Sequence, residues 1–135
     1  MQKLWLMAIM LLLMSSCGPE PRKAQQKIEE GKIFTIQANY KMAIDAFDQA
    51  IEYDPSSYEA YFQRGSAYFN TRNYKKAVED FLKAVELNPG YADAWFNLGQ
   101  IMEIEMDQEM ACYYFKKAQE YGRANIGDYL RKCPQ

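Results

Sequence analysis

A pattern with a period of 34 residues runs through most of this 135-residue chain. Its most regular members are Gly31, Gly65 and Gly99, which are spaced by 34 residues, and each is followed by an alanine and a phenylalanine at constant distances. These followers are Ala43, Ala77 and Ala111, and Phe47, Phe81 and Phe115. Periods of this length are typical of arrays in which each unit packs only on its neighbours. The sequence therefore predicts a repeat array, a kind of protein that serves as a scaffold for other macromolecules.

Each unit has the pattern of two short amphipathic helices joined by a turn. Asn39, Asn73 and Asp107 stand where the second helix begins and can accept a bond from its free N–H groups. Proline ends the second helix at Pro55 and Pro89. We predict an all-α fold, an α-solenoid of three helix-turn-helix repeats at 24–57, 58–91 and 92–125, with a short capping helix at 126–135.

The same positions carry a family resemblance. An aromatic residue, Gly, a large residue, Ala, Phe, Ala and Pro follow one another at fixed spacing, and this order resembles the tetratricopeptide repeat. The first repeat departs from it at Lys27, where the aromatic residue is expected, and the third at Arg123, where Pro is expected. In the second repeat the matching residues are Tyr61, Gly65, Tyr68, Ala77, Phe81, Ala84 and Pro89.

The N-terminus has the order of an export signal. Lys3 precedes the unbroken apolar run Leu4–Met14, which is too short to span a bilayer core that takes roughly 20 helical residues. Ser15, Ser16 and Cys17 follow, and with Met14 they resemble the lipobox of bacterial lipoproteins. The resemblance implies that the cysteine is acylated and becomes the new N-terminus.

We therefore expect residues 1–16 to be a lipoprotein signal peptide, Cys17 to be the lipidation site and 17–23 to be a tether, with the chain held at the bacterial cell envelope. Gly18 rather than Asp follows the cysteine, which in lipoproteins of the enterobacterial type implies the outer membrane. The alternative is an ordinary cleaved signal peptide, or a buried N-terminal helix, with an inert cysteine.

Composition argues against catalysis and against nucleic acid. The chain contains no histidine and has a formal net charge of −2, so the commonest general base and metal ligand and any strongly basic surface are missing. Glu103, Glu105, Asp107 and Glu109 alternate along the chain and point in different directions on a helix. We expect no enzymatic activity, no cofactor, no metal, no nucleic acid and no small-molecule substrate.

The first helices of a stacked array line a concave surface, and the partner-binding groove is predicted there. Ile28, Phe62 and Phe96 would form an apolar ladder along it, flanked by amides and carboxylates suited to a peptide. The alternative is that this ladder packs between the helices. The predicted groove residues are Ile28, Lys32, Glu59, Phe62, Gln63, Ser66, Phe69, Asp93, Phe96, Asn97, Gln100 and Glu103.

One subclass of the family is excluded by its charges. The co-chaperone members clamp a C-terminal carboxylate with Lys, Asn, Asn, Lys and Arg, and Asp93 would repel such a group. Together with Glu59 and Glu103 it gives a groove that favours neutral or basic segments. The five clamp positions hold Ile28, Lys32, Gln63, Asp93 and Asn97.

Two cysteines lie near the C-terminus. Cys112 occupies the repeat position of Val78 and Ile44, both apolar, and is predicted to be a buried small hydrophobe. Cys133 falls near the same helix, and an oxidising compartment would allow the two to form a disulfide, subject to strict geometry. The sequence leaves that pairing open.

These features predict a protein-binding adaptor that holds an unidentified protein partner and attaches to the membrane through a lipid anchor at Cys17. A self-associating structural protein is the alternative, because three repeats leave open stacking ends. Tyr113, Tyr114 and Tyr121 would then meet a neighbouring molecule.

Overall fold

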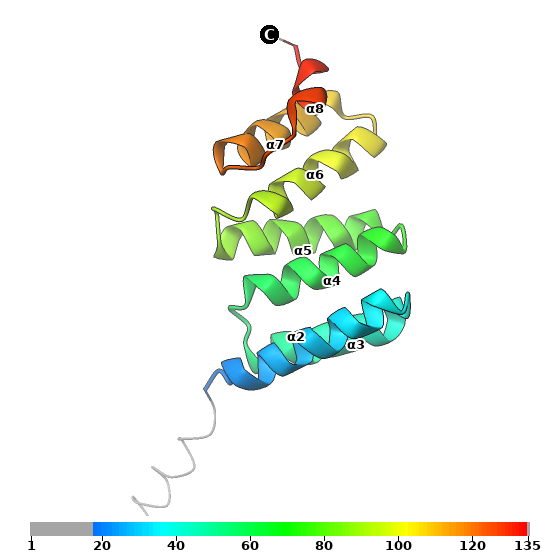
Figure 1. The fold of residues 1–135 in the computed structure, drawn as a ribbon, viewed down its shortest axis with the longest axis vertical. Coiled ribbons are helices and arrows are strands. Elements are labelled where there is room, and N and C mark those ends of the chain that lie inside the picture. The colour runs from blue at the N-terminus through cyan, green and yellow to red at the C-terminus, as the bar shows by residue number, and fades with distance from the viewer. Residues whose placement is uncertain (1–17, 135) are drawn as a thin grey trace, which may run out of the picture.

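The computed structural model describes residues 18–134, and within that range it contains helices and no strands. Each of the first six helices pairs with its neighbour in the chain, and a short helix follows the last pair (Figure 1). This confirms the predicted all-α solenoid. The helices are α2 (Pro21–Ile36), α3 (Tyr40–Tyr53), α4 (Tyr58–Asn70), α5 (Tyr74–Leu87), α6 (Ala92–Ile104), α7 (Gln108–Glu120) and α8 (Gly127–Arg131).

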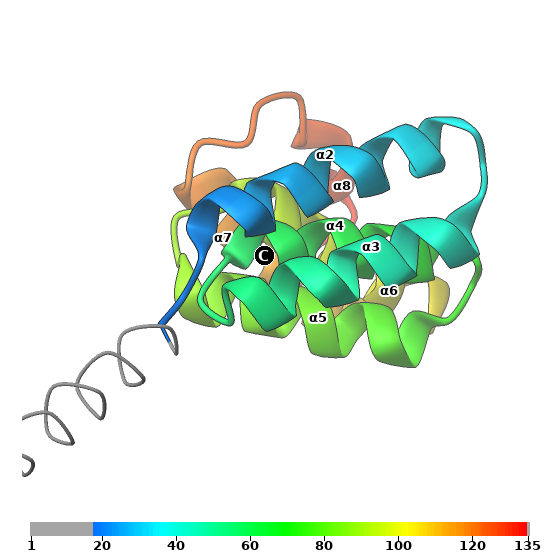
Figure 2. The ribbon, with the colours of Figure 1, turned by 90° about the horizontal axis from the view of Figure 1, so that it is seen from below.

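The pairs stack along one axis, from α2 and α3 at one end to α7 and α8 at the other (Figure 1). The turns within pairs lie along one edge of the stack and the connections between pairs along the opposite edge. Figure 2 looks along the stack from the α2 end, with the later repeats behind the first. Contacts are therefore mostly between neighbours, as expected for a repeat array.

The predicted caps begin the second helix of every pair. Side-chain oxygens of Asn39, Asn73 and Asp107 accept hydrogen bonds from the backbone N–H groups of Met42, Lys76 and Met110. Each cap satisfies one of the helix N–H groups that has no partner inside the helix. The 34-residue recurrence of Asn, Asn and Asp is thus explained by helix capping.

The residue before each cap adopts a left-handed conformation that the sequence did not predict. Ala38, Arg72 and Met106 have φ values of 56°, 60° and 61°, which glycine adopts more readily than these residue types. The next N–H then bonds back to the helix, for example from Asn73 to the carbonyl of Tyr68 at 2.8 Å. This closure reverses the chain within a few residues and sets the angle between paired helices.

The first helix begins earlier than expected. Its first residue is Pro21, inside the predicted tether of 17–23, because proline is well suited to the first helical position, where its missing N–H has no helical partner. The N–H of Glu20 donates to the carbonyl of Tyr53 at 2.7 Å and ties this start to the end of α3. The described part of the tether is therefore residues 18–20, and the apolar run and Cys17 lie outside the described residues.

No helix of residues 18–134 combines the length and the hydropathy that crossing a bilayer would require.

A glycine and a phenylalanine meet inside each pair. A Cβ added to Gly31 or Gly99 would lie less than 3.0 Å from the ring of Phe47 or Phe115. At Gly65 the corresponding contact with the ring of Phe81 is looser, at 3.0 Å. The phenylalanine rings are fully buried, so the repeated glycines serve as space for them.

Arg64 in the middle repeat is the centre of a partly buried ion network that sequence reasoning missed. The guanidinium of Arg64 donates to both carboxylate oxygens of Asp80, at 2.9 and 2.7 Å, and to Asp48 on α3 at 2.6 Å. Burial raises the pKa of Asp80, and the hydrogen bonds from Arg64 oppose that rise. The signal was present, because the position 34 residues after Arg64 holds the fully buried Leu98.

The glycine contacts predict an order of stability. Gly31→Ala and Gly99→Ala should each lower the free energy of unfolding by about 1–3 kcal/mol, because the added methyl group overlaps a ring that cannot move away. Gly65→Ala should cost less, since the better helix propensity of alanine, up to about 1 kcal/mol, offsets a smaller overlap.

Urea denaturation of the variants measures this order. Gly127→Ala is the matched control, because a Cβ there meets no atom within 4 Å, and it should leave stability unchanged or raised. Equal losses at all four positions would show that ring contact is not the cause.

Candidate functional site

The predicted groove residues lie on α2, α4 and α6, and most are half-buried, as expected for side chains that line a shallow concave face. Two are not. Ile28 is 1% exposed and Phe96 is 9% exposed. The half-buried ones are Lys32, Glu59, Phe62, Gln63, Ser66, Phe69, Asp93, Asn97, Gln100 and Glu103.

Ile28 and Phe96 therefore pack between helices and are not available to a partner, contrary to our prediction. Ile28 packs against Ala50 and Ala60 of the next two helices. The Phe96 ring packs on Tyr129 at a centroid distance of 5.1 Å, and the Arg123 guanidinium covers it at 4.3 Å. Both side chains are covered because the following elements close over them.

Phe62 is only partly covered. Its ring contacts Phe81 and Tyr91, with centroids 5.6 and 4.8 Å apart. It remains half-buried, so one part of the ladder still reaches the surface in the middle repeat.

The carboxylates of the groove are all paired, which corrects the expectation of an acidic surface. Lys32 contacts Glu59 at 2.6 Å, and this hydrogen bond raises the pKa of Lys32.

The other two pairs are Asp93 with Arg123 and Glu103 with Lys132. The groove is thereby close to neutral. Lys32–Glu59 links the first repeat to the second, Asp93–Arg123 ties α6 to the loop after α7, and Glu103–Lys132 ties α6 to the C-terminal cap.

Polar groups that can bind a peptide backbone recur along the first helices. Gln63 and Asn97 occupy one repeat position, and Ser66 and Gln100 another. The Ser66 hydroxyl donates to the carbonyl of Phe62 at 2.9 Å. The amides of Gln63, Asn97 and Gln100 are half-buried, and each offers both a donor and an acceptor.

A hollow of about 480 Å³ lies at the start of α6, where the loop after α7 approaches it. Asp93 and Phe96, both predicted, contribute to its wall, and Tyr91, Arg123 and Asn125 were missed. Burial raises the pKa of Tyr91. Arg123 stands at the repeat position where proline is expected, and this departure was the signal in the sequence. The loop that carries Arg123 approaches the start of α6.

The tyrosines proposed for self-association are mostly engaged within the chain. Tyr114 is 8% exposed, and both it and Tyr121 stack on Trp95, with centroids 6.0 and 6.4 Å away. The Trp95 indole N–H in turn donates to the carbonyl of Pro89 at 2.8 Å. Tyr113 keeps 49% and Tyr121 36% of its surface exposed, so this cluster offers a neighbour two side chains rather than three.

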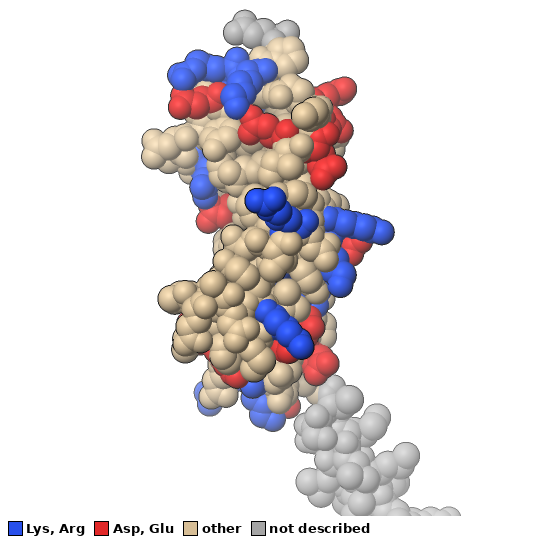
Figure 3. All heavy atoms as spheres, turned by 90° about the vertical axis from the view of Figure 1, so that its right-hand side faces the viewer, with Lys and Arg blue, Asp and Glu red and all other residues tan. Residues whose placement is uncertain are grey.

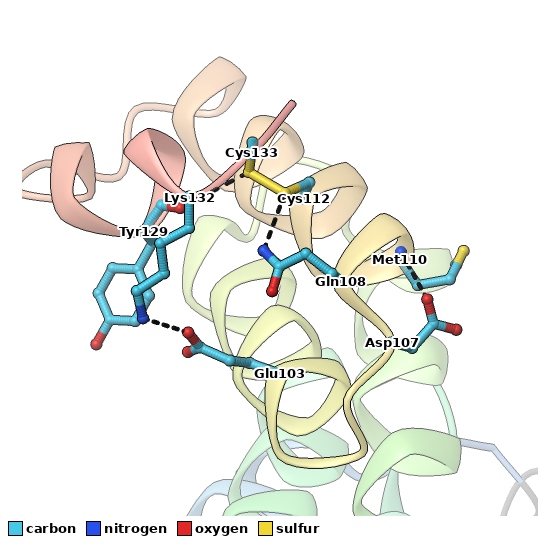
Figure 4. Close-up of a disulfide and its surroundings, with 8 residues drawn as sticks. All are labelled: Glu103, Asp107, Gln108, Met110, Cys112, Tyr129, Lys132 and Cys133. Atoms are coloured by element: carbon cyan, nitrogen blue, oxygen red, sulfur yellow. Dashed lines mark hydrogen bonds and ion pairs between the residues drawn. A yellow bond between two sulfur atoms is a disulfide. The ribbon is translucent and has the colours of Figure 1, made fainter. Parts of the chain in front are cut away.

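The structure answers the open question about the cysteines. Cys112 on α7 and Cys133 after α8 form a disulfide with Cα atoms 5.5 Å apart (Figure 4). Cys112 is 5% exposed, as predicted for its repeat position. Close to this disulfide, Tyr129 packs on Phe115, and Lys132 reaches Glu103. The bridge therefore holds α8 over the end of the core.

The disulfide closes a separation of 21 residues, for which a stabilisation of about 2–4 kcal/mol is typical. We expect a dithiol reductant to lower the urea midpoint of the chain that keeps Cys112 and Cys133 to the midpoint of the Cys133→Ala variant. Both proteins carry Cys17→Ser so that no third thiol can exchange. The reductant should leave the Cys133→Ala midpoint unchanged, and an equal effect on both proteins would contradict the bridge.

Comparisons with known proteins agree with this geometry. Family models described as tetratricopeptide repeats match residues 58–91 and 81–133, and one described as TPR repeat matches 31–71. Together they extend from Gly31 to Cys133. No curated protein sequence matches the chain.

Three solved structures illustrate the likeness. The first TPR of Spaghetti (RPAP3), bound to the HSP90 peptide SRMEEVD, has a TM-score of 0.81 and 26% identity, over 87% of this chain and 94% of that one. The Sgt2 TPR domain from Aspergillus fumigatus has a TM-score of 0.76 and 27% identity, over 86% and 79%. The TPR2B domain of yeast Sti1, in a complex with pHsp70, has a TM-score of 0.76 at 19% identity, over 82% and 95%, and supports the fold alone.

Proposed function

This chain belongs to the tetratricopeptide repeat family, and from that premise we propose that it is a non-enzymatic adaptor of the bacterial cell envelope that holds a partner protein in its concave groove. The observation that carries the proposal is the recurrence of half-buried side-chain amides, Gln63, Asn97 and Gln100, on neighbouring first helices. Side-chain amides at regular spacing can pair with the backbone of an extended segment. A repeated backbone-binding group is a property of a peptide groove.

The charges indicate which segment would bind. The similar Spaghetti (RPAP3) structure holds the acidic peptide SRMEEVD. In this chain Lys32 is already paired with Glu59, and Asp93 stands where the clamp of the co-chaperone members has a lysine. We therefore propose an extended segment without net charge, rather than an acidic C-terminus.

The Phe62 ring supplies the apolar contact. It is half-buried, lies between Phe81 and Tyr91 and stands next to Gln63. An aromatic edge flanked by amides suits a segment with one large apolar residue. The hollow beside Asp93 and Arg123 would take a polar side chain of the same segment.

The anchor is proposed from the sequence order alone. Two acyl chains on Cys17 would hold the protein at the membrane, since each buried methylene contributes about 0.8 kcal/mol. Cys17 to Glu20 is a link of four residues before α2, which reaches at most about 14 Å. The groove would then lie close to the membrane surface, and Gly18 favours the outer membrane.

The groove is tested by photocrosslinking in cells. A photoreactive residue at Asn97 should capture a partner protein, whereas one at Glu86, exposed on the second helix α5, should not. Gln63→Ala with Gln100→Ala should reduce the yield at least fivefold, because each lost hydrogen bond is worth about 1 kcal/mol.

Gln119→Ala is the control variant, an exposed glutamine on α7 that should leave the yield unchanged. The groove proposal fails if the same proteins are captured at both positions with equal yields.

The anchor is tested by metabolic labelling with a palmitate analogue. The chain with Cys17 should incorporate the label and sediment with membranes, and Cys17→Ser should lose both properties, because the thiol is the acylated atom. Equal labelling of the two proteins would reject the lipobox interpretation and leave the groove proposal untouched.

A further inference from the structure

A second hollow lies between α5 and α6 and shares no residue with the groove. Its volume is about 400 Å³. Val78, Ile101 and Met102 form its apolar floor, while Lys75 on α5 and Glu105 directly after α6 stand at its rim. Tyr74 and Glu79 complete the lining.

The hollow arises from a difference between repeats. Met102 stands at the repeat position of Tyr68, and Val78 at that of Ile44. One repeat earlier the large Tyr68 ring stands at this position and packs toward α5, where the ammonium of Lys76 lies 5.1 Å from its centroid. An unbranched methionine and a shorter aliphatic side chain occupy less width, so an apolar surface stays open.

The two sides of this hollow carry opposite charges. Lys75 belongs to the basic start of α5, whereas Glu105 is followed by Asp107 and Glu109 at the next turn. Figure 3 looks onto the edge that carries the turns within the pairs, where Lys and Arg project from the middle and Asp and Glu gather above them. Neither Lys75 nor Glu105 takes part in an ion pair within residues 18–134.

An exposed apolar side chain stands beside the acidic rim. Met106 is 91% exposed and directly follows Glu105, and its backbone is held in the turn with φ 61°. Ile104 on the other side of Glu105 is 47% exposed. Burying a methionine side chain contributes about 1.5–3 kcal/mol. A neighbouring molecule that buries Met106 in an apolar hollow would therefore be stabilised in its contact with this turn.

We propose that the chain forms a twofold symmetric dimer through this edge, with Met106 of each copy in the α5–α6 hollow of the other. A twofold interface brings the same patch together in reversed order. Lys75 of each copy then faces Glu105 of the other. A surface that is basic on one side and acidic on the other is complementary to itself under a twofold rotation. For this reason we propose a second copy of the chain, rather than another protein, as the occupant of the hollow.

Sedimentation equilibrium of the full-length chain in density-matched detergent tests the dimer. The unmodified chain should associate reversibly to a dimer. Lys75→Glu alone and Glu105→Lys alone should each weaken association at least tenfold, because each puts like charges together at two contacts. An equimolar mixture of these two variants should regain the original affinity, since both contacts of the mixed dimer then join a carboxylate to an ammonium group.

Two further variants complete the test. Met106→Ala should weaken association without changing the urea midpoint by more than a small amount, as its side chain is exposed in the single chain. Lys41→Glu is the matched control, because Lys41 is the equivalent of Lys75 one repeat earlier, and it should leave association unchanged.

Three results would overturn the proposal. One is a chain that remains monomeric up to about millimolar concentration. Another is a dimer that survives both charge reversals, which would place the contact elsewhere, including in residues 1–17. The last is a mixture that associates no better than its components. None of these results bears on the groove, because the groove variants and these variants share no residue.

Discussion

The contact of a phenylalanine ring with a glycine backbone sets the distance between the two helices of each pair, and the rest of the array depends on that distance. Gly31, Gly65 and Gly99 let the rings of the second helices reach the first helices. Because every pair then has the same thickness and the same turn, the pairs stack in register. The concave face, the ion pairs across it and the hollow between α5 and α6 all follow from that register.

The fold could be predicted because its determinants are local and recur. Asn39, Asn73 and Asp107 cap helices within three residues of themselves, and such signals can be found without knowing the tertiary structure. The left-handed turn residues escaped prediction because Ala38, Arg72 and Met106 share no residue type. At these three positions the geometry of the turn between paired helices imposes the left-handed conformation, whatever the residue type.

The candidate site was harder to predict, because exposure and pairing depend on contacts between elements. Phe62 and Phe96 occupy the same repeat position, yet Tyr129 and Arg123 cover only Phe96. Glu103 looked like a free acid, but its partner Lys132 lies 29 residues away. Arg64 could have been recognised, since a charged residue at the position of a buried leucine requires an anion, although only the structure identifies Asp80 and Asp48.

The disulfide also makes the two ends of the array unequal in stability. A stack of repeats loses structure from its ends inward, because terminal units have neighbours on one side only. At the α8 end the Cys112–Cys133 bridge keeps the last helix in place. At the other end no covalent link within residues 18–134 holds α2, which is kept in place by its packing, the backbone hydrogen bond from Glu20 to Tyr53 and the ion pair of Lys32 with Glu59. Under mechanical or thermal stress the chain would therefore fray from its N-terminal repeat, and the half of the groove formed by α6 would persist after the half formed by α2 had opened.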